Sequence, residues 1–124
     1  MKTRILRKFS FDAAHQLFTM PEGHKCRRMH GHTYQCEIAC EGEVDPAVGF
    51  FMDYGDLKKH IEPIIDALDH HYLNDIPGLE VPTAEIIAKW IYDQLKPGLP
   101  ELVCVRLFET PNNGVEYAPS ASDE

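Results

Sequence analysis

Apolar and polar residues alternate along two stretches in the first third of the chain, and a period of two predicts β-strands. The first stretch is residues 4–11, where Ile5, Phe9 and Phe11 fall on one face. The second stretch, residues 32–41, is the most regular in the sequence. Its apolar face carries Tyr34, Cys36, Ile38 and Cys40, on the same side as His32. We expect these two strands to pair as antiparallel neighbours.

Two later stretches have apolar residues every three or four positions, the spacing of an amphipathic helix. The first follows Asp53, a suitable N-cap residue, and contains Pro63, which should kink the helix or loosen a turn. Its apolar residues are Leu57, Ile61, Ile64, Ile65 and Leu68. The second follows Thr83, also a suitable N-cap, and stops at Pro97-Gly98. Its apolar residues are Ile86, Ile87, Trp90, Ile91 and Leu95.

Shorter apolar runs complete the pattern. Residues 50–52 predict a third strand, residues 102–108 a fourth, and residues 115–117 a strand that returns from a hairpin turn. This order of strands, two helices and strands predicts a single α+β domain, an antiparallel sheet with two helices on one face. We assign residues 1–117 to the domain and expect residues 118–124 to be a flexible C-terminal tail.

The strand predicted at residues 102–108 would be apolar on both faces. One face would carry Val103, Val105 and Leu107, and the other Leu102, Cys104 and Phe108. Two helices on one face leave the other face and the edges of a small sheet without cover. We therefore expect the chain to form oligomers.

Composition and charge narrow the range of partners. The chain has 124 residues and a net charge of −8, so its surface as a whole should repel nucleic acid and anionic lipid. No apolar run has the length of a membrane helix, and Arg7 and Lys8 interrupt the region where a signal peptide would be apolar. The 4 cysteines include no C-x-x-C pair, and we interpret them as free thiols in a reducing, cytoplasmic compartment.

Candidate chemistry is concentrated in residues 23–32. His30 and His32 are two residues apart, so on a strand they point to the same side and can bind one metal ion. His15 ends the first predicted strand, and antiparallel pairing would place it beside them. Three imidazoles that leave one position open are the pattern of a catalytic zinc site. The sequence therefore predicts zinc on His15, His30 and His32.

Cys26 lies four residues before His30 and is surrounded by the cations Lys25, Arg27 and Arg28. Positive neighbours favour the thiolate, which can act as a nucleophile or a general base. The same spacing would allow Cys26 to be a fourth zinc ligand, and the residues alone leave both roles open. The three cations oppose the acidic background and could hold an anionic part of a substrate.

Two further carboxylates are candidates. Asp69 precedes His70 and could raise its pKa and fix its tautomer. His71 is adjacent, so only one of the two imidazoles can point into a given pocket, and Asp66 and Asp69 could simply decorate a helix end. Glu109 ends the apolar strand and precedes Thr110. It could be solvated, or it could be a buried carboxylate that accepts two N–H bonds from a guanidine-like edge.

These residues together resemble the 6-pyruvoyltetrahydropterin synthase family and, within it, the bacterial 6-carboxytetrahydropterin synthase branch of 7-deazapurine and queuosine biosynthesis. The resemblance rests on His15, on Cys26-x3-His30-Gly31-His32, on residues 68–74 and 82–85, and on Glu109-Thr110. It implies a tunnelling fold whose subunits form a barrel of trimers, commonly stacked as a hexamer. It also implies zinc on the three histidines.

The resemblance assigns a role to each candidate residue. Cys26 would be the general base, Asp69 and His70 the relay for a second proton, and Glu109 the anchor of the pterin ring. Thr110, Lys25 and Arg27 would help to bind the substrate, 7,8-dihydroneopterin triphosphate. The implied products are 6-carboxy-5,6,7,8-tetrahydropterin, acetaldehyde and triphosphate. The alternatives are 6-pyruvoyltetrahydropterin synthase itself and a non-catalytic zinc-binding or pterin-binding module.

Overall fold

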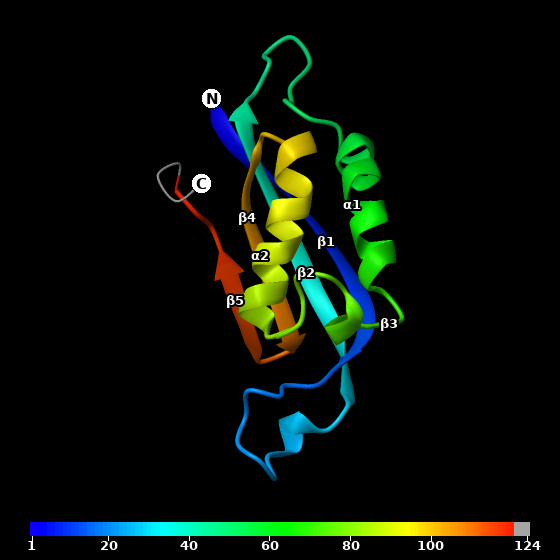
Figure 1. Cartoon of the computed structure of the whole chain (residues 1–124). Coiled ribbons are helices and arrows are strands. Elements are labelled where there is room, and N and C mark those ends of the chain that lie inside the picture. Colours follow the sequence, from blue (N-terminus) through cyan, green and yellow to red (C-terminus); the bar gives the residue numbers. More distant parts are fainter. Residues whose placement is uncertain (121–124) are drawn as a thin grey trace.

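A computed structural model describes residues 1–120 as one sheet covered on one face by two helices (Figure 1). The strands are β1 (Lys2–His15), β2 (His30–Glu43), β3 (His71–Tyr72), β4 (Leu102–Thr110) and β5 (Asn113–Tyr117). The helices are α1 (Tyr54–Leu68) and α2 (Ala84–Leu95), with short 3-10 turns η1 (Lys25–Arg27), η2 (Leu73–Asp75) and η3 (Lys96–Gly98). The predicted tail falls partly on residues 121–124, which lie outside the described residues.

The sheet order is β3-β1-β2-β4-β5. The four long strands are antiparallel, as the alternation predicts, whereas the two-residue β3 runs parallel to β1 beside Ala13 and Ala14. β1 and β2 are longer than predicted and pair along their whole length, so that His15 lies directly opposite His30. This pairing confirms the predicted neighbours and brings the candidate histidines to one end of the sheet.

The core lies between the sheet and the two helices. Tyr34, Ile38 and Cys40 of β2 are fully buried there, in line with the predicted apolar face. Burial of one such aliphatic side chain contributes about 1.5–3 kcal/mol to the free energy of folding. The predicted helix faces are largely confirmed, with Leu57, Ile61, Leu68, Ile87, Ile91 and Leu95 all buried. Ile64, Ile65 and Trp90 are half-buried against the core, and Ile86 remains 39% exposed.

Both helix starts are confirmed. The Asp53 carboxylate accepts hydrogen bonds from the N–H groups of Gly55 and Asp56, and the Thr83 hydroxyl accepts one from Ile86. Helix α1 continues across Pro63. Pro63 cannot donate to the carbonyl of Lys59, but both residues are exposed, so water can take the place of that bond.

Two strand predictions are wrong in detail. Residues 50–52 form no strand; Phe50 makes one isolated bridge to Asp45 within the long connection to α1. In β4 the register shifts opposite Ala39 and Cys40, which places Leu102, Val105 and Leu107 on the helix face. A bulge adds one residue to a strand and so breaks the alternation that a sequence pattern assumes.

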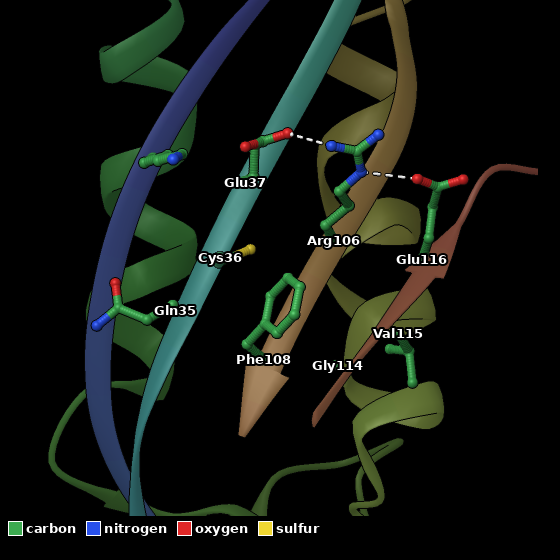
Figure 2. A pocket seen from close by; sticks show the side chains of 9 residues that line it. Gln35, Cys36, Glu37, Arg106, Phe108, Gly114, Val115 and Glu116 are labelled. Carbon is green, nitrogen blue, oxygen red and sulfur yellow. Dashed lines mark hydrogen bonds and ion pairs between the residues drawn. The ribbon is translucent and has the colours of Figure 1, made fainter. Parts of the chain in front are cut away.

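The face of the sheet away from the helices is polar (Figure 2). Arg106 of β4 pairs with Glu37 of β2 and Glu116 of β5, and the Phe108 ring lies against Gly114. The expectation that β4 carries apolar residues on this face is confirmed for Phe108, which is 38% exposed there, and is wrong for Leu102, which is buried in the core against the helices. The two edges of the sheet remain open, because β1 pairs on its outer side only at Ala13 and Ala14, and β5 has no outer partner within residues 1–120.

None of the helices within residues 1–120 is long and apolar enough to cross a membrane.

Candidate active site

The three predicted metal ligands come together at one end of β1 and β2. One ligand atom from each of His15, His30 and His32 lies within 4.8 Å of the other two. The closest pair is the Nε2 atoms of His15 and His30, which are 2.9 Å apart. The strand register explains this proximity, since His15 pairs with His30 and Ala13 pairs with His32.

Backbone carbonyls select the ring nitrogens that face the cluster. The Nδ1 atom of His15 lies 2.8 Å from the carbonyl oxygen of Pro82, and that of His30 lies 2.8 Å from the carbonyl oxygen of Arg28. A carbonyl only accepts, so each Nδ1 carries the proton and donates it. When both rings carry only this proton, their Nε2 atoms present lone pairs to each other.

Burial lowers the pKa of two of these imidazoles, His15 and His32. His15 has no exposed surface, and desolvation lowers its pKa, an effect that the charge of Glu109 partly opposes. Desolvation also lowers the pKa of His32, again against the charge of Glu109. The hydroxyl of buried Tyr34 lies 3.3 Å from Nδ1 of His15, and desolvation raises its pKa, so it stays protonated. Neutral imidazole is the form that binds metal ions.

The cluster fits a zinc ion. Two lone pairs 2.9 Å apart repel each other unless a proton or a cation lies between them. Two nitrogens bound to one tetrahedral zinc at the usual bond length are about 3.3 Å apart, so only a small adjustment would be needed. A hydrogen-bonded Nδ1 is also the usual outer support of a zinc-bound histidine. The structure thus contains a possible three-histidine metal site.

Cys26 lies on η1, in the loop between β1 and β2 that extends past the end of the sheet (Figure 1). Its N–H donates to Nδ1 of His24, and its carbonyl accepts from the N–H of Leu17. The thiol is half-buried. Within residues 1–120, its sulfur does not join the three histidine nitrogens that lie within 4.8 Å of one another.

The cations near Cys26 differ in what they do. Nη1 of Arg27 donates to the carbonyls of Phe18 and Met20, at 2.6 and 3.0 Å, and its guanidinium lies over the Phe18 ring. Arg27 therefore holds the loop together. Lys25 and Arg28 are exposed on the same loop.

Gln16 ties this loop to the segment after α1. Its side-chain amide donates to the carbonyl of Arg27 and accepts from the hydroxyl of Tyr72. Its backbone exchanges two hydrogen bonds with the side-chain amide of Asn74. These contacts fix the Cys26 loop relative to residues 69–74.

Asp69 and His70 form the predicted pair at the end of α1. Oδ2 of Asp69 lies 2.9 Å from Nδ1 of His70, and hydrogen bonding to Asp69 raises the pKa of His70. His70 has φ +60°, a left-handed conformation that is rare outside glycine. The imidazole of His70 is exposed, whereas Nδ1 of His71 lies 2.8 Å from the carbonyl oxygen of Asp69. The pairing supports His70 rather than His71 as the partner of the carboxylate.

Glu109 lies near the end of β4, on the side of the sheet where its charge acts on His15 and His32. The neighbouring Thr110 uses its hydroxyl to accept the N–H groups of Asn112 and Asn113, which closes the turn to β5. A single chain therefore places Glu109 near the histidines. Asp69 and His70 form a separate cluster, and one open hollow is lined by both His32 and His70.

Comparison with known proteins matches this arrangement to one family. The sequence profile described as 6-pyruvoyl tetrahydropterin synthase covers residues 4–120. The chain belongs to the 6-pyruvoyl tetrahydropterin synthase family. It is accordingly an enzyme of the pterin synthase kind, as the sequence motifs indicate.

Relatives within the family differ in the activity that their names state. The chain is 42% identical to a 6-carboxy-5,6,7,8-tetrahydropterin synthase of Synechocystis, over 91% of each chain. It is 38% identical to a dihydroneopterin monophosphate aldolase of Pyrococcus furiosus, over 94% of this chain and 97% of the relative. The solved structure of 6-pyruvoyl tetrahydropterin synthase from Caenorhabditis elegans superposes with a TM-score of 0.89 at 31% identity, over 97% of each chain. This likeness confirms the predicted tunnelling fold of the subunit.

The sequence motifs did not reveal every residue that supports this site. Asp12, Gln16 and Tyr34 hold the candidate residues through hydrogen bonds to the Asp69 carboxylate, to the Arg27 carbonyl and to the His15 ring. Asp12 and Gln16 flank the predicted ligand His15 closely in sequence, which is the one signal that could have indicated them.

Proposed function

We propose that this chain is a zinc-dependent 6-carboxytetrahydropterin synthase. It would convert 7,8-dihydroneopterin triphosphate and one water to 6-carboxy-5,6,7,8-tetrahydropterin, acetaldehyde and triphosphate, in 7-deazapurine and queuosine biosynthesis. The observation that supports it most is the pair of facing Nε2 lone pairs of His15 and His30, with His32 beside them, in a chain 42% identical to a protein of that name. The free, unpaired cysteines suit a cytoplasmic enzyme.

His15, His30 and His32 would hold the zinc, which when bound supplies a Lewis acid for the hydroxyls of the substrate side chain. Cys26 would act as the general base that removes a side-chain proton. Its place outside the group of close ligand atoms supports the role of base over that of a fourth ligand. The hydrogen bonds from Leu17 and to His24 hold its backbone, so the thiol keeps a defined position.

The Asp69–His70 pair would move the second proton. Asp69 occupies Nδ1 of His70, so Nε2 is the atom left to exchange a proton with the substrate. The raised pKa of His70 favours the imidazolium, which can donate that proton as the ring is reduced to the tetrahydro level. Glu109 would accept two N–H bonds from the aminopyrimidinone edge of the pterin.

Lys25 and Arg28 are the best placed cations for the triphosphate. Both are exposed on the loop that carries Cys26. Arg27 would contribute mainly by holding that loop, because its guanidinium already donates to two loop carbonyls. Thr110 would contribute through the turn that it closes beside Glu109.

We also propose that the chain works as a homotrimer or a hexamer. The outer edge of β1 and the edge strand β5 both present unpaired backbone groups along part of their length within residues 1–120. Pairing of β1 with β5 of the next copy would join sheets head to tail, and such heterologous contacts close into a ring. The exposed His70 would then be covered by a neighbouring copy. Light scattering should report a mass of three or six chains.

The decisive test is metal analysis and product identification on the wild type and Cys26→Ala, with Cys104→Ala as a buried control thiol. We expect Cys26→Ala to keep one zinc per chain and to lose turnover by about a hundredfold or more. Loss of zinc would make Cys26 a ligand, and unchanged turnover would favour a binding module. A product that retains the side-chain carbons would favour 6-pyruvoyl synthase, and activity only on a monophosphate would favour the aldolase named for the Pyrococcus relative.

A further inference from the structure

The Asp69–His70 pair is attached to β1 through Asp12. The backbone N–H of Asp12 donates to Oδ1 of Asp69 at 2.8 Å. The backbone carbonyl of Asp12 accepts from the N–H of His70 at 2.6 Å. One residue of β1 thus fixes both members of the pair, and these bonds hold His70 in its left-handed conformation at φ +60°.

The side chain of Asp12 also faces the pair. Its carboxylate, the carboxylate of Asp69 and a ring nitrogen of His70 all lie within 4.8 Å of one another. Thr33, on the neighbouring strand β2, donates its hydroxyl to Oδ1 of Asp12 and so holds that carboxylate in place. Two carboxylates this close to one imidazole favour its protonated form.

We propose that Asp12 is a positioning residue of the relay, whose carboxylate, held by Thr33, keeps His70 as the imidazolium at the start of each turnover. This role deepens the proposed function and rests on it. Asp12 itself need not touch the substrate. The proton that His70 donates would be restored from water in the open hollow that His70 lines together with His32.

The charged groups around His70 agree with this role. The hydrogen bond and the charge of Asp69 raise the pKa of His70 most, and the charge of Asp12 raises it further, while partial desolvation opposes them. The pKa of Asp69 is lowered first by the N–H of Asp12 and then by His70 and His71. His32 of β2 lines the same hollow, and desolvation lowers its own pKa, which favours its neutral form.

The test is an NMR titration of the His70 ring in the zinc-loaded enzyme, with the signal assigned by its loss in His70→Gln. Asp12→Asn keeps the size of the side chain and both backbone bonds but removes the charge. We expect the ratio of protonated to neutral His70 at a fixed pH to fall about three- to fivefold, the effect of one unit charge at this range in water. Thr33→Val should shift the ratio in the same direction by a smaller factor. Asp93→Asn, a carboxylate of α2 that pairs with Lys89, is the matched control and should leave it unchanged.

The pH profile of kcat should follow the titration, with its alkaline limb moving to lower pH in Asp12→Asn while KM changes little. A His70 titration that is the same in Asp12→Asn, Thr33→Val and the wild type would overturn the role of Asp12, whatever turnover does. A His70 titration that shifts while the kcat limb stays fixed would overturn the link of Asp12 to the relay. Absence of a pterin product from wild-type enzyme with full zinc would instead refute the proposed function, which the NMR result alone cannot do.

Discussion

His15 and His30 face each other across β1 and β2, with their Nε2 atoms 2.9 Å apart and each Nδ1 bound to a backbone carbonyl. Neither ring can turn its proton toward the other without losing its carbonyl partner. The pair is therefore set up to share a cation, and His32 adds a third nitrogen within 4.8 Å.

The first prediction concerns these ligands. His30→Ala should lower the zinc affinity about a hundredfold or more, because it removes a direct ligand. Loss of an outer-shell partner alone costs about ten- to hundredfold. His60→Ala, on the exposed side of α1, is the control and should keep full zinc. The measurement is zinc content by mass spectrometry after dialysis against a weak chelator. Equal zinc in the two variants would contradict the three-histidine site.

This cluster was predictable from the sequence because two simple rules meet there. Alternation places His30 and His32 on one side of a strand, and antiparallel pairing returns His15 to the same end. The helix starts were predictable for a similar reason, since Asp53 and Thr83 act on N–H groups two or three residues away.

Other features depend on long-range contacts that no local pattern contains. Because of the bulge of β4 opposite Ala39, the residues of β4 that face the helices differ from those that strict alternation predicts. Arg27 remains a predicted substrate-binding residue, and no local pattern indicates that its Nη1 also donates to loop carbonyls nine and seven residues away. Asp12 holds the Asp69–His70 pair through its backbone, and a backbone contact can be made by almost any residue type, so the type of residue gives no sign of it.

The second prediction separates Arg27 from Arg28. Arg27→Ala should free the Cys26 loop, which we expect to lower kcat about tenfold and to speed proteolysis within residues 16–29, because two hydrogen bonds to loop carbonyls are lost. Arg28→Ala should mainly raise KM for the triphosphate substrate, since its charge is exposed. Steady-state kinetics and limited proteolysis check both. A raised KM with normal kcat in Arg27→Ala would favour Arg27 as a substrate-binding residue.

The third prediction concerns the helix caps. Asp53→Ala should lower the free energy of unfolding by about 1 kcal/mol, because two N–H groups at the start of α1 lose their acceptor. Thr83→Ala should cost less, since the Thr83 hydroxyl accepts only from Ile86, at 3.3 Å. Lys59→Ala is an exposed control on α1 and should stay within about 0.5 kcal/mol of the wild type. Urea unfolding of the zinc-free protein at one pH measures all three, and a larger loss in Thr83→Ala would contradict the ranking.

The fourth prediction is the pH dependence of stability in the zinc-free protein. Burial lowers the pKa of His15 and His32 in the folded state, whereas in the unfolded chain both titrate near the usual value of about 6.5. Between the lowered and the usual pKa the unfolded chain binds more protons, so stability is fully present above about pH 6.5 and falls as the pH drops toward the folded pKa. Thermal unfolding of the zinc-free wild type should show this loss, and a His15→Gln, His32→Gln double variant should show a flatter curve over the same range. Saturating zinc should move the loss to lower pH, because zinc binds the same neutral rings and competes with protons. If the thermal stability of the zinc-free wild type does not change as the pH falls from about 7 to below about 6.5, the burial of neutral imidazoles at this site would be contradicted.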